Sequence, residues 1–228
     1  MAVGDIHIED EAPKMLKDMM KDLKAAGVDT LYIEFDKSTW EFVQKLDDKQ
    51  LRDYAHGKEV NGKALSTPKE QSRIYGVTHS DNWPRESLLM FAEARKNGIE
   101  VVNIDKRNVD LNFEDNGERR MAHTNLEWVD AIKQDRAQNH KTGKYIVWAG
   151  VLHFMDMGTV DEAMGIPSIA FDKSFSPFGF KAKKDSGFDF TLRGGIDHFD
   201  IDKIRDIRPT DLPLPQQQAS ATELPARQ

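Results

Sequence analysis

The sequence contains no cysteine among its 228 residues. Disulfide bonds, thiolate nucleophiles and cysteine-ligated zinc sites are therefore excluded. The net charge is −7, so the strong positive field that attracts nucleic acid is lacking, and we expect no nucleic-acid partner. No apolar run approaches the roughly 20 residues that a membrane-spanning helix needs. No signal peptide is recognisable, and because the first predicted strand starts almost at Met1, we expect no targeting segment.

Several motifs of familiar enzyme classes are also absent. There is no G-x-S-x-G sequence, so an acyl-enzyme route lacks a candidate nucleophile. There is no P-loop, and no G-x-G-x-x-G follows a predicted strand. The zinc-protease sequence H-E-x-x-H is missing as well.

The pattern of apolar residues predicts the fold class. Hydrophobic residues make up 39% and charged residues 31% of the chain, as in a globular domain. Runs typical of strands occur over Val3–His7, Thr30–Phe35, Ile99–Asp105, Lys144–Leu152, Ser168–Asp172 and Phe188–Arg193. Helical spacing of apolar residues fills the intervals after Pro13, after Pro84 and over residues 118–137. This alternation predicts an α/β fold with a mostly parallel central sheet flanked by helices on both faces.

The domain organisation follows from the same pattern. Residues 1–207 are predicted to form a single α/β domain. Residues 36–82 interrupt the alternation, and we interpret them as a helical insertion that could cover the site as a lid. There, Ser38 and Glu41 would form a capping box for a helix through Leu51. Residues 208–228 are rich in Pro, Gln, Ala and Ser, which predicts a flexible C-terminal tail.

Titratable residues stand at the ends of four predicted strands. They are His7, Glu34, Asp105 and His153. In parallel α/β sheets, ligands bind beyond the carboxyl ends of the strands, and these ends share one edge. We therefore expect the four side chains to approach one another there.

Two kinds of chemistry suit such a group. A histidine with a near-neutral pKa can take a proton from water, and a neighbouring carboxylate can orient its ring and stabilise the imidazolium. The second histidine could then protonate a leaving group or bind an oxyanion. Alternatively, two histidines and a carboxylate match the ligand set of a divalent metal. The residues alone leave both readings open.

Further candidates lie on a loop and on a helix. His79, in the sequence THSDNWP, could reach the site from a loop and bind substrate. Asn125 lies on the helix before the His153 strand and is a second candidate for substrate binding. Arg120, on the same helix, could bind an anion or pair with Glu34.

At this point the order of the motifs resembles a known superfamily. The segment GDIHIEDEAPKMLKDMMKDLKAAGVDTLYIE resembles the opening of the erythromycin esterase/ChaN/TIKI superfamily, in which a strand ending Gly-Glu-x-His precedes a helix and a strand ending in Glu. NIDKRN, RRMAHTNLEWVDAI and KYIVWAGVLHF resemble its later parts. Across residues 3–172 the chain is most similar to the toxin and effector branch, which includes HopBA-type type III effectors of plant-pathogenic Pseudomonas.

The resemblance implies roles for these residues. His7 would be the water-activating base or a metal ligand, Glu34 its partner, and His153 the second catalytic or ligand histidine. The supporting groups would be Asp5, Asp105 and Arg120. A divalent metal bound by His7, Glu34 and His153 is the alternative to a site without a cofactor. The superfamily includes metal-independent esterases, metal-dependent proteases and haem binders, so the resemblance does not fix the reaction.

The leading hypothesis is a hydrolase-like bacterial effector, esterase-like or metal-dependent. It would be secreted into the host cytoplasm, act on a host protein or a small molecule, and trigger a response such as cell death. A non-enzymatic effector recognised through a protein surface is the second hypothesis. A metal-binding or haem-binding protein is the third, and an ordinary soluble cytoplasmic location is the alternative to secretion.

Overall fold

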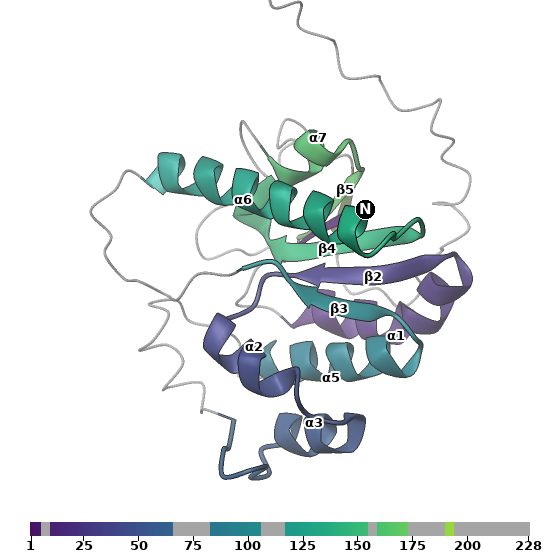
Figure 1. The fold of residues 1–228 in the computed structure, drawn as a ribbon, viewed down its shortest axis with the longest axis vertical. Coiled ribbons are helices and arrows are strands. Elements are labelled where there is room, and N and C mark those ends of the chain that lie inside the picture. Colours follow the sequence, from purple (N-terminus) through teal and green to yellow (C-terminus); the bar gives the residue numbers. More distant parts are fainter. Residues whose placement is uncertain (6–9, 66–82, 106–116, 155–158, 173–189, 194–228) are drawn as a thin grey trace, which may run out of the picture. The chain divides into compact units, whose positions relative to one another are not determined.

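The computed structural model describes residues 1–5, 10–65, 83–105, 117–154, 159–172 and 190–193. Their strands form one six-stranded sheet in the order β3-β2-β4-β1-β5-β6 (Figure 1). The strands are β1 (Ala2–Asp5), β2 (Val28–Ile33), β3 (Glu100–Asn103), β4 (Lys144–Gly150), β5 (Ser168–Asp172) and β6 (Phe190–Arg193). Every pairing among them is parallel. The predicted α/β class with a parallel sheet is confirmed.

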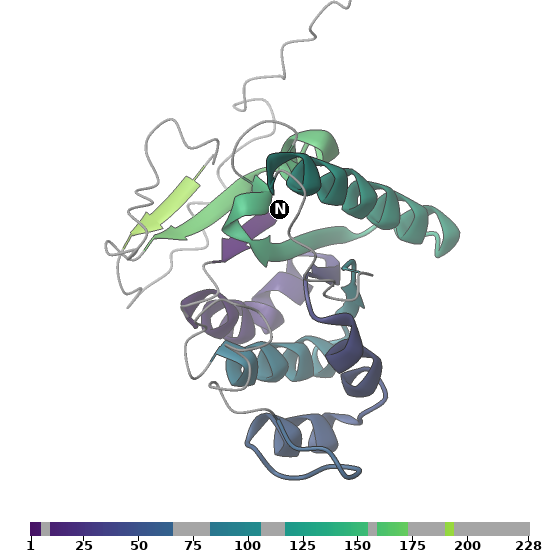
Figure 2. The ribbon, with the colours of Figure 1, turned by 90° about the vertical axis from the view of Figure 1, so that its left-hand side faces the viewer.

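Helices cover both faces of this sheet (Figures 1 and 2). On one face lie α1 (Glu11–Ala25) and α5 (Trp83–Lys96), and α3 (Asp48–Ala55) packs onto α5. The short α2 (Lys37–Val43) joins this layer. On the other face lie α6 (Gly117–Gln138) and α7 (Val160–Met164), with a short 3-10 helix, η1 (Val151–Phe154), directly after β4. In the described part of the chain, no helix is both long and apolar enough to cross a membrane.

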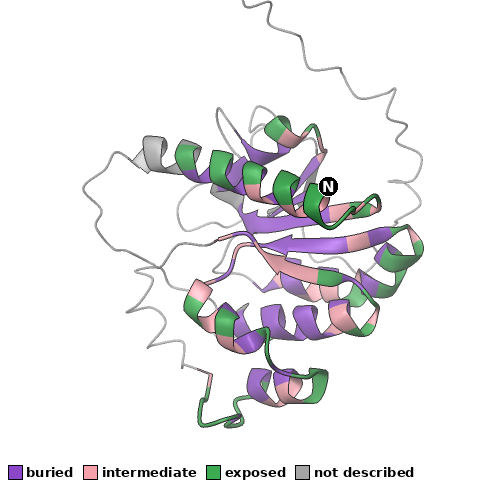
Figure 3. Ribbon diagram, in the orientation of Figure 1, coloured by how far each residue is buried: buried purple, intermediate pink, exposed green. Residues whose placement is uncertain are grey.

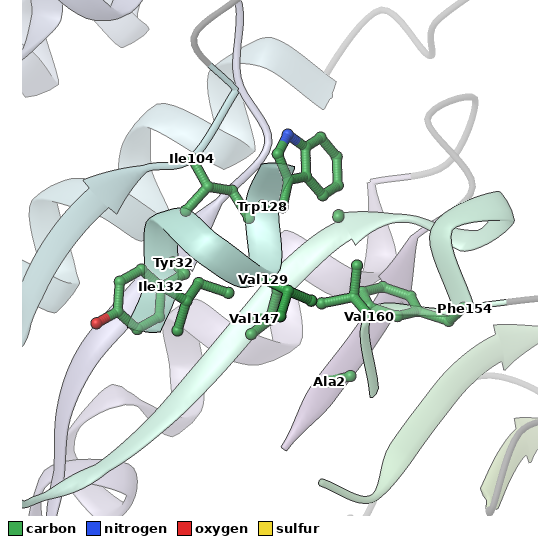
Figure 4. Packing of buried hydrophobic residues seen from close by; sticks show 10 residues of the cluster. Ala2, Tyr32, Ile104, Trp128, Val129, Ile132, Val147, Phe154 and Val160 are labelled. Carbon is green, nitrogen blue, oxygen red and sulfur yellow. The ribbon is translucent and has the colours of Figure 1, made fainter. Parts of the chain in front are cut away.

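Successive side chains of β4 point to opposite faces of the sheet, so this strand packs against the helices on both faces. Val147 and Ala149 point to the α6 face, where they join a cluster with Trp128 and Phe154 (Figure 4). Trp148 points the other way, and its ring lies 6.1 Å from that of Phe91 on α5. Figure 3 shows the result: the central strands β2 and β4 are mostly buried, the edge strand β3 is mostly intermediate, and the helices have exposed outer faces.

The helical insertion is confirmed in its described part, but its predicted capping box is wrong. Asp36, not Ser38, caps α2, because its carboxylate accepts a hydrogen bond from the Thr39 amide at 2.7 Å. The helix ends at Val43 instead of running through Leu51. A second helix, α3, begins after Asp47, whose side chain forms a complete capping box with Gln50.

Some predictions about organisation fall outside the described residues. The second half of the insertion, from residue 66, and the predicted tail are among them. The lid function and the domain end at residue 207 therefore stay predictions.

The sheet order creates a divergence of the chain at the carboxyl edge. β1 and β2 lead into α1 and α2 on one face, whereas β4 lies between them and leads through η1 to α7 on the other face. Where neighbouring strands send their connections to opposite faces of a parallel sheet, ligands bind beyond the carboxyl ends of those strands. The residues just after β2 and β4 are therefore placed where a site is expected.

Candidate functional site

His153 lies at the centre of the candidate site. The buried strand β4 ends at Gly150, and η1 then turns the chain beneath α6. His153 is only 6% exposed there. Its ring packs on the indole of Trp128, with the ring centres 4.0 Å apart and the planes inclined by 31°. The imidazole is thus held against α6.

Asn125 holds the same ring at its edge. Its Oδ1 lies 2.6 Å from Nδ1 of His153. Asn125 and Trp128 are three residues apart on α6, and this spacing puts them on one face of the helix. One helical turn therefore supplies both a packing surface and a hydrogen-bond partner for the imidazole.

Glu34 approaches His153 from the neighbouring strand. It directly follows β2, and its amide continues the ladder by donating to the Trp148 carbonyl at 3.0 Å. One carboxylate oxygen, Oε2, accepts a hydrogen bond from the Gly150 amide at 2.7 Å. The other, Oε1, lies 3.5 Å from Nε2 of His153. The Glu34 side chain is 19% exposed and the His153 side chain 7% exposed, so solvent reaches Glu34 more than His153.

The spacing of this pair limits what it can do. A separation of 3.5 Å is too long for a strong direct hydrogen bond. A single water molecule can nevertheless contact both atoms at ordinary hydrogen-bond length, about 2.8 Å from each. A water molecule, or the polar atom of a ligand, that lies beside this pair can therefore contact both the carboxylate and the imidazole.

A family comparison identifies the kind of protein. The family model described as "Type III effector protein HopBA1" matches residues 1–181. The chain belongs to the HopBA1 type III effector family. Membership in a type III effector family implies secretion into host cells and a host target. This confirms the predicted effector and type III secretion classes.

A solved structure supports the same fold. The chain is similar to "The structure of the type III effector HopBA1", with a TM-score of 0.57 and 20% sequence identity over 85% of this chain and 86% of that chain. A second match is RRSP, a MARTX toxin effector domain from Vibrio vulnificus, with a TM-score of 0.44 and 17% identity. It covers 75% of this chain and 33% of that chain. Comparison with curated proteins gave no match.

Asp5 and Asp105 lie at the predicted edge of this HopBA1-family sheet. Asp5 is buried at the end of β1, in register with Gly150. Ala2 packs on the α6 side, so strand alternation places Asp5 on the opposite face from Ala2. Glu34, by contrast, shares the face of Tyr32, which is on the α6 side. Asp105 follows β3 and is half-buried.

Sequence reasoning missed Asn103, the last residue of β3. Its side chain accepts from the Phe35 amide at 3.1 Å and donates to the Phe35 carbonyl at 2.8 Å. It also accepts from the Asp105 amide at 3.2 Å. Asn103 therefore joins the segments that leave β2 and β3, and so supports the chain next to Glu34. The only signal was a polar residue in the apolar run IEVVNI.

Three predicted residues of this family member cannot be placed. His7 and His79 lie outside the described residues, and so does the side chain of Arg120 on α6. Within the described ranges, no three His, Asp or Glu side chains form a group that could hold a metal ion. Glu34 and His153 offer two donor atoms, and the predicted third ligand is His7. The metal alternative therefore stays a prediction.

Proposed function

We propose that this HopBA1-family protein is a hydrolase-like effector in which Glu34 and His153 activate water inside the host cell. The observation that carries the proposal is the 3.5 Å separation between Glu34 Oε1 and His153 Nε2. Each side chain is held from behind by its own partner, Gly150 for Glu34 and Asn125 for His153. The two polar atoms that face each other are therefore fixed by separate elements of the fold.

The reaction step uses these atoms in an ordinary way. A water molecule beside the pair loses a proton to Nε2 while its oxygen forms a bond to the substrate, and the imidazolium returns that proton to the leaving group when the scissile bond breaks. The imidazolium that forms lies next to the Glu34 carboxylate, which stabilises the positive charge. General-base catalysis of this kind contributes about 10²–10⁴-fold to a rate.

The remaining roles extend the resemblance to the erythromycin esterase/ChaN/TIKI superfamily. The resemblance makes His7 the base, but we propose His153 for that role, because it is the described histidine beside Glu34, and His7 as the second catalytic histidine. Asp105 and Arg120 are proposed as supporting groups. Asp5, which lies on the opposite face of the sheet from Glu34, is proposed to support the end of β1 and not the water itself. His79 is proposed to bind substrate. Strand β1 leads directly into the segment that contains His7, and β1 is the neighbour of β4 in the sheet. The proposed outcome in the host is a response such as cell death.

The experiment compares matched variants produced inside plant cells. Glu34→Gln removes the proposed carboxylate and His153→Gln removes the proposed general base, and each variant keeps a side chain of similar size. Glu127→Gln and His123→Gln change the same residue types on the exposed side of α6, where these two side chains face each other at 3.4 Å. We expect the first two variants to lose the host response and the second two to keep it.

The purified variants must also unfold within a few degrees of the wild-type protein, so that lost response is not lost fold. In Glu34→Gln the new amide oxygen can still accept the Gly150 hydrogen bond, which makes this the stricter variant. Full host response from folded Glu34→Gln and His153→Gln proteins would reject water activation at this pair. It would favour an effector that is recognised through its surface.

A further inference from the structure

We propose that Asn125 is a positioning residue that keeps His153 in the tautomer protonated at Nδ1, with the Nε2 lone pair turned toward Glu34. The catalytic meaning of this tautomer rests on the function proposed above, but the tautomer itself does not. The inference combines two distances at opposite sides of one ring. They are 2.6 Å from Nδ1 to Asn125 Oδ1 and 3.5 Å from Nε2 to Glu34 Oε1.

The shorter contact decides where the proton lies. An amide oxygen only accepts hydrogen bonds, so a contact of 2.6 Å with Nδ1 requires the hydrogen on the ring nitrogen. With the proton on Nε2 instead, two lone pairs would face each other at 2.6 Å inside a buried site. The Nδ1–H tautomer also places an Nε2 lone pair opposite Glu34 Oε1, but at 3.5 Å this repulsion is weaker than that between two lone pairs at 2.6 Å.

The consequence for the pair with Glu34 follows from the chemistry of imidazole. A neutral ring carries one N–H, so a proton on Nδ1 leaves Nε2 as an acceptor. Nε2 can then take a proton from water, in which case the O–H bond breaks and an Nε2–H bond forms. In the resulting imidazolium, Nδ1–H still points at Asn125 and Nε2–H now points at the carboxylate. Both contacts are satisfied in the form that the reaction creates.

Burial makes this arrangement specific. Asn125 is 2% exposed and Trp128 1% exposed, so bulk water does not compete for the ring from the α6 side. The Trp128 indole covers one face of the imidazole and restrains its rotation. Turning the ring over would replace Nδ1 by a carbon opposite the Asn125 oxygen and lose the hydrogen bond.

The tautomer can be read directly by NMR. Long-range ¹H–¹⁵N correlation spectra of the ¹⁵N-labelled full chain distinguish the two nitrogens of each histidine in its neutral form. We expect His153 to show the Nδ1–H pattern in the wild-type protein. Asn125→Leu, which keeps the volume but removes the acceptor, should shift His153 mainly to Nε2–H. Asn125→Asp, which restores an acceptor, should restore Nδ1–H.

Asn139→Leu is the matched control, because Asn139 comes directly after α6 and is exposed. It should leave the His153 pattern unchanged. An Nε2–H pattern in the wild type, or an unchanged pattern in Asn125→Leu, would overturn the proposal. The first result would mean that the amide presents its NH₂ group to the ring.

The outcome is separable from the proposed function. An Nδ1–H pattern together with a full host response from His153→Gln would keep the positioning role and reject catalysis. An Nε2–H pattern together with a lost response from His153→Gln would do the reverse.

Discussion

Replacing Tyr32 by phenylalanine should lower the free energy of unfolding by about 2 kcal/mol, the cost of one hydrogen bond to a charged group. The Tyr32 ring is fully buried in β2, and its hydroxyl donates to Asp135 Oδ2 on α6 at 2.6 Å. This bond fastens the helix that carries Asn125 and Trp128 to the sheet. Its loss therefore tests how strongly α6, which contacts His153 through Asn125 and Trp128, is held against the sheet.

The magnitude follows from what the substitution leaves in place. Phenylalanine keeps the ring and its edge contact with Tyr145, whose ring centre lies 5.7 Å away. Asp135 keeps a hydrogen bond from Lys141 at 2.6 Å and one from Asn139 at 2.8 Å. The Asp135 carboxylate therefore keeps hydrogen-bond partners after the substitution. We place the loss in free energy of unfolding in the lower part of the range of about 1.5–3 kcal/mol.

The deficit should also depend on pH. Burial tends to raise the pKa of Asp135, but hydrogen bonds from Lys141, Tyr32 and Asn139 outweigh it, and the pKa is lowered. A lowered pKa stabilises the fold above the unfolded value of about 3.9, and this contribution is lost as the pH falls below it. The difference between wild type and Tyr32→Phe should therefore shrink in acid.

Alkaline pH gives a second check. Burial and the Asp135 carboxylate raise the pKa of Tyr32 well above its ordinary value. The unfolded chain ionises this tyrosine from about pH 10, while the folded chain keeps it neutral. The wild-type protein should therefore lose stability above about pH 10, and Tyr32→Phe should lack that part of the loss.

Urea denaturation followed by circular dichroism at about pH 7, about pH 3 and above about pH 10 measures these differences. The matched control at neutral and acid pH is Tyr54→Phe, since the Tyr54 side chain makes no hydrogen bond within the described ranges, and its cost there should stay within about 0.5 kcal/mol. Burial raises the pKa of Tyr54 as well, so this control does not serve above about pH 10. A Tyr32→Phe cost no larger than that of Tyr54→Phe would refute the reasoning. So would a deficit that is the same in acid as at neutral pH.

Three further substitutions test the packing by the same denaturation assay. Trp128→Ala should cost about 3–5 kcal/mol, because the indole is buried between α6, the sheet and His153, whereas Trp128→Phe should cost clearly less; equal costs would contradict this packing. Asp47→Ala should cost about 1 kcal/mol through loss of the α3 cap, and Asp48→Ala, one residue further on, should cost less. Gly143→Ala should cost about 1–3 kcal/mol, because a new Cβ would collide with the Asp29 carboxylate that accepts the Gly143 amide hydrogen bond; a neutral effect would show that Asp29 moves freely.

The fold was largely predictable because it depends on local patterns. Buried parallel strands require short apolar runs, and all six predicted runs overlap observed strands. The capping box was not predictable in the same way, since aspartate, serine and threonine all cap helices, and Asp36, Ser38 and Thr39 stand close together at the start of α2. Asp36 prevails because its carboxylate reaches the Thr39 amide.

The candidate site was predictable only in part. The rule of strand ends was enough to select Glu34 and His153, because topology alone brings those ends together. The contact between Asn125 and His153 depends on how α6 is rotated above η1, which no spacing in the sequence encodes. The role of Asn103 has the same origin, since its partners lie on a neighbouring strand end.

The most direct test of the account is a double-mutant comparison of Glu34→Gln, His153→Gln and the double variant in the host response. Two residues that act on one water form a unit, so removing both should cost no more than removing either one. We expect each single variant to raise the expression level needed for the response by about 10²-fold or more, because His153→Gln removes the general base and Glu34→Gln removes the carboxylate that stabilises the imidazolium. The double variant should be no weaker than the weaker single variant. Multiplying effects, or a response from either single variant that equals the wild type, would contradict a shared role for Glu34 and His153.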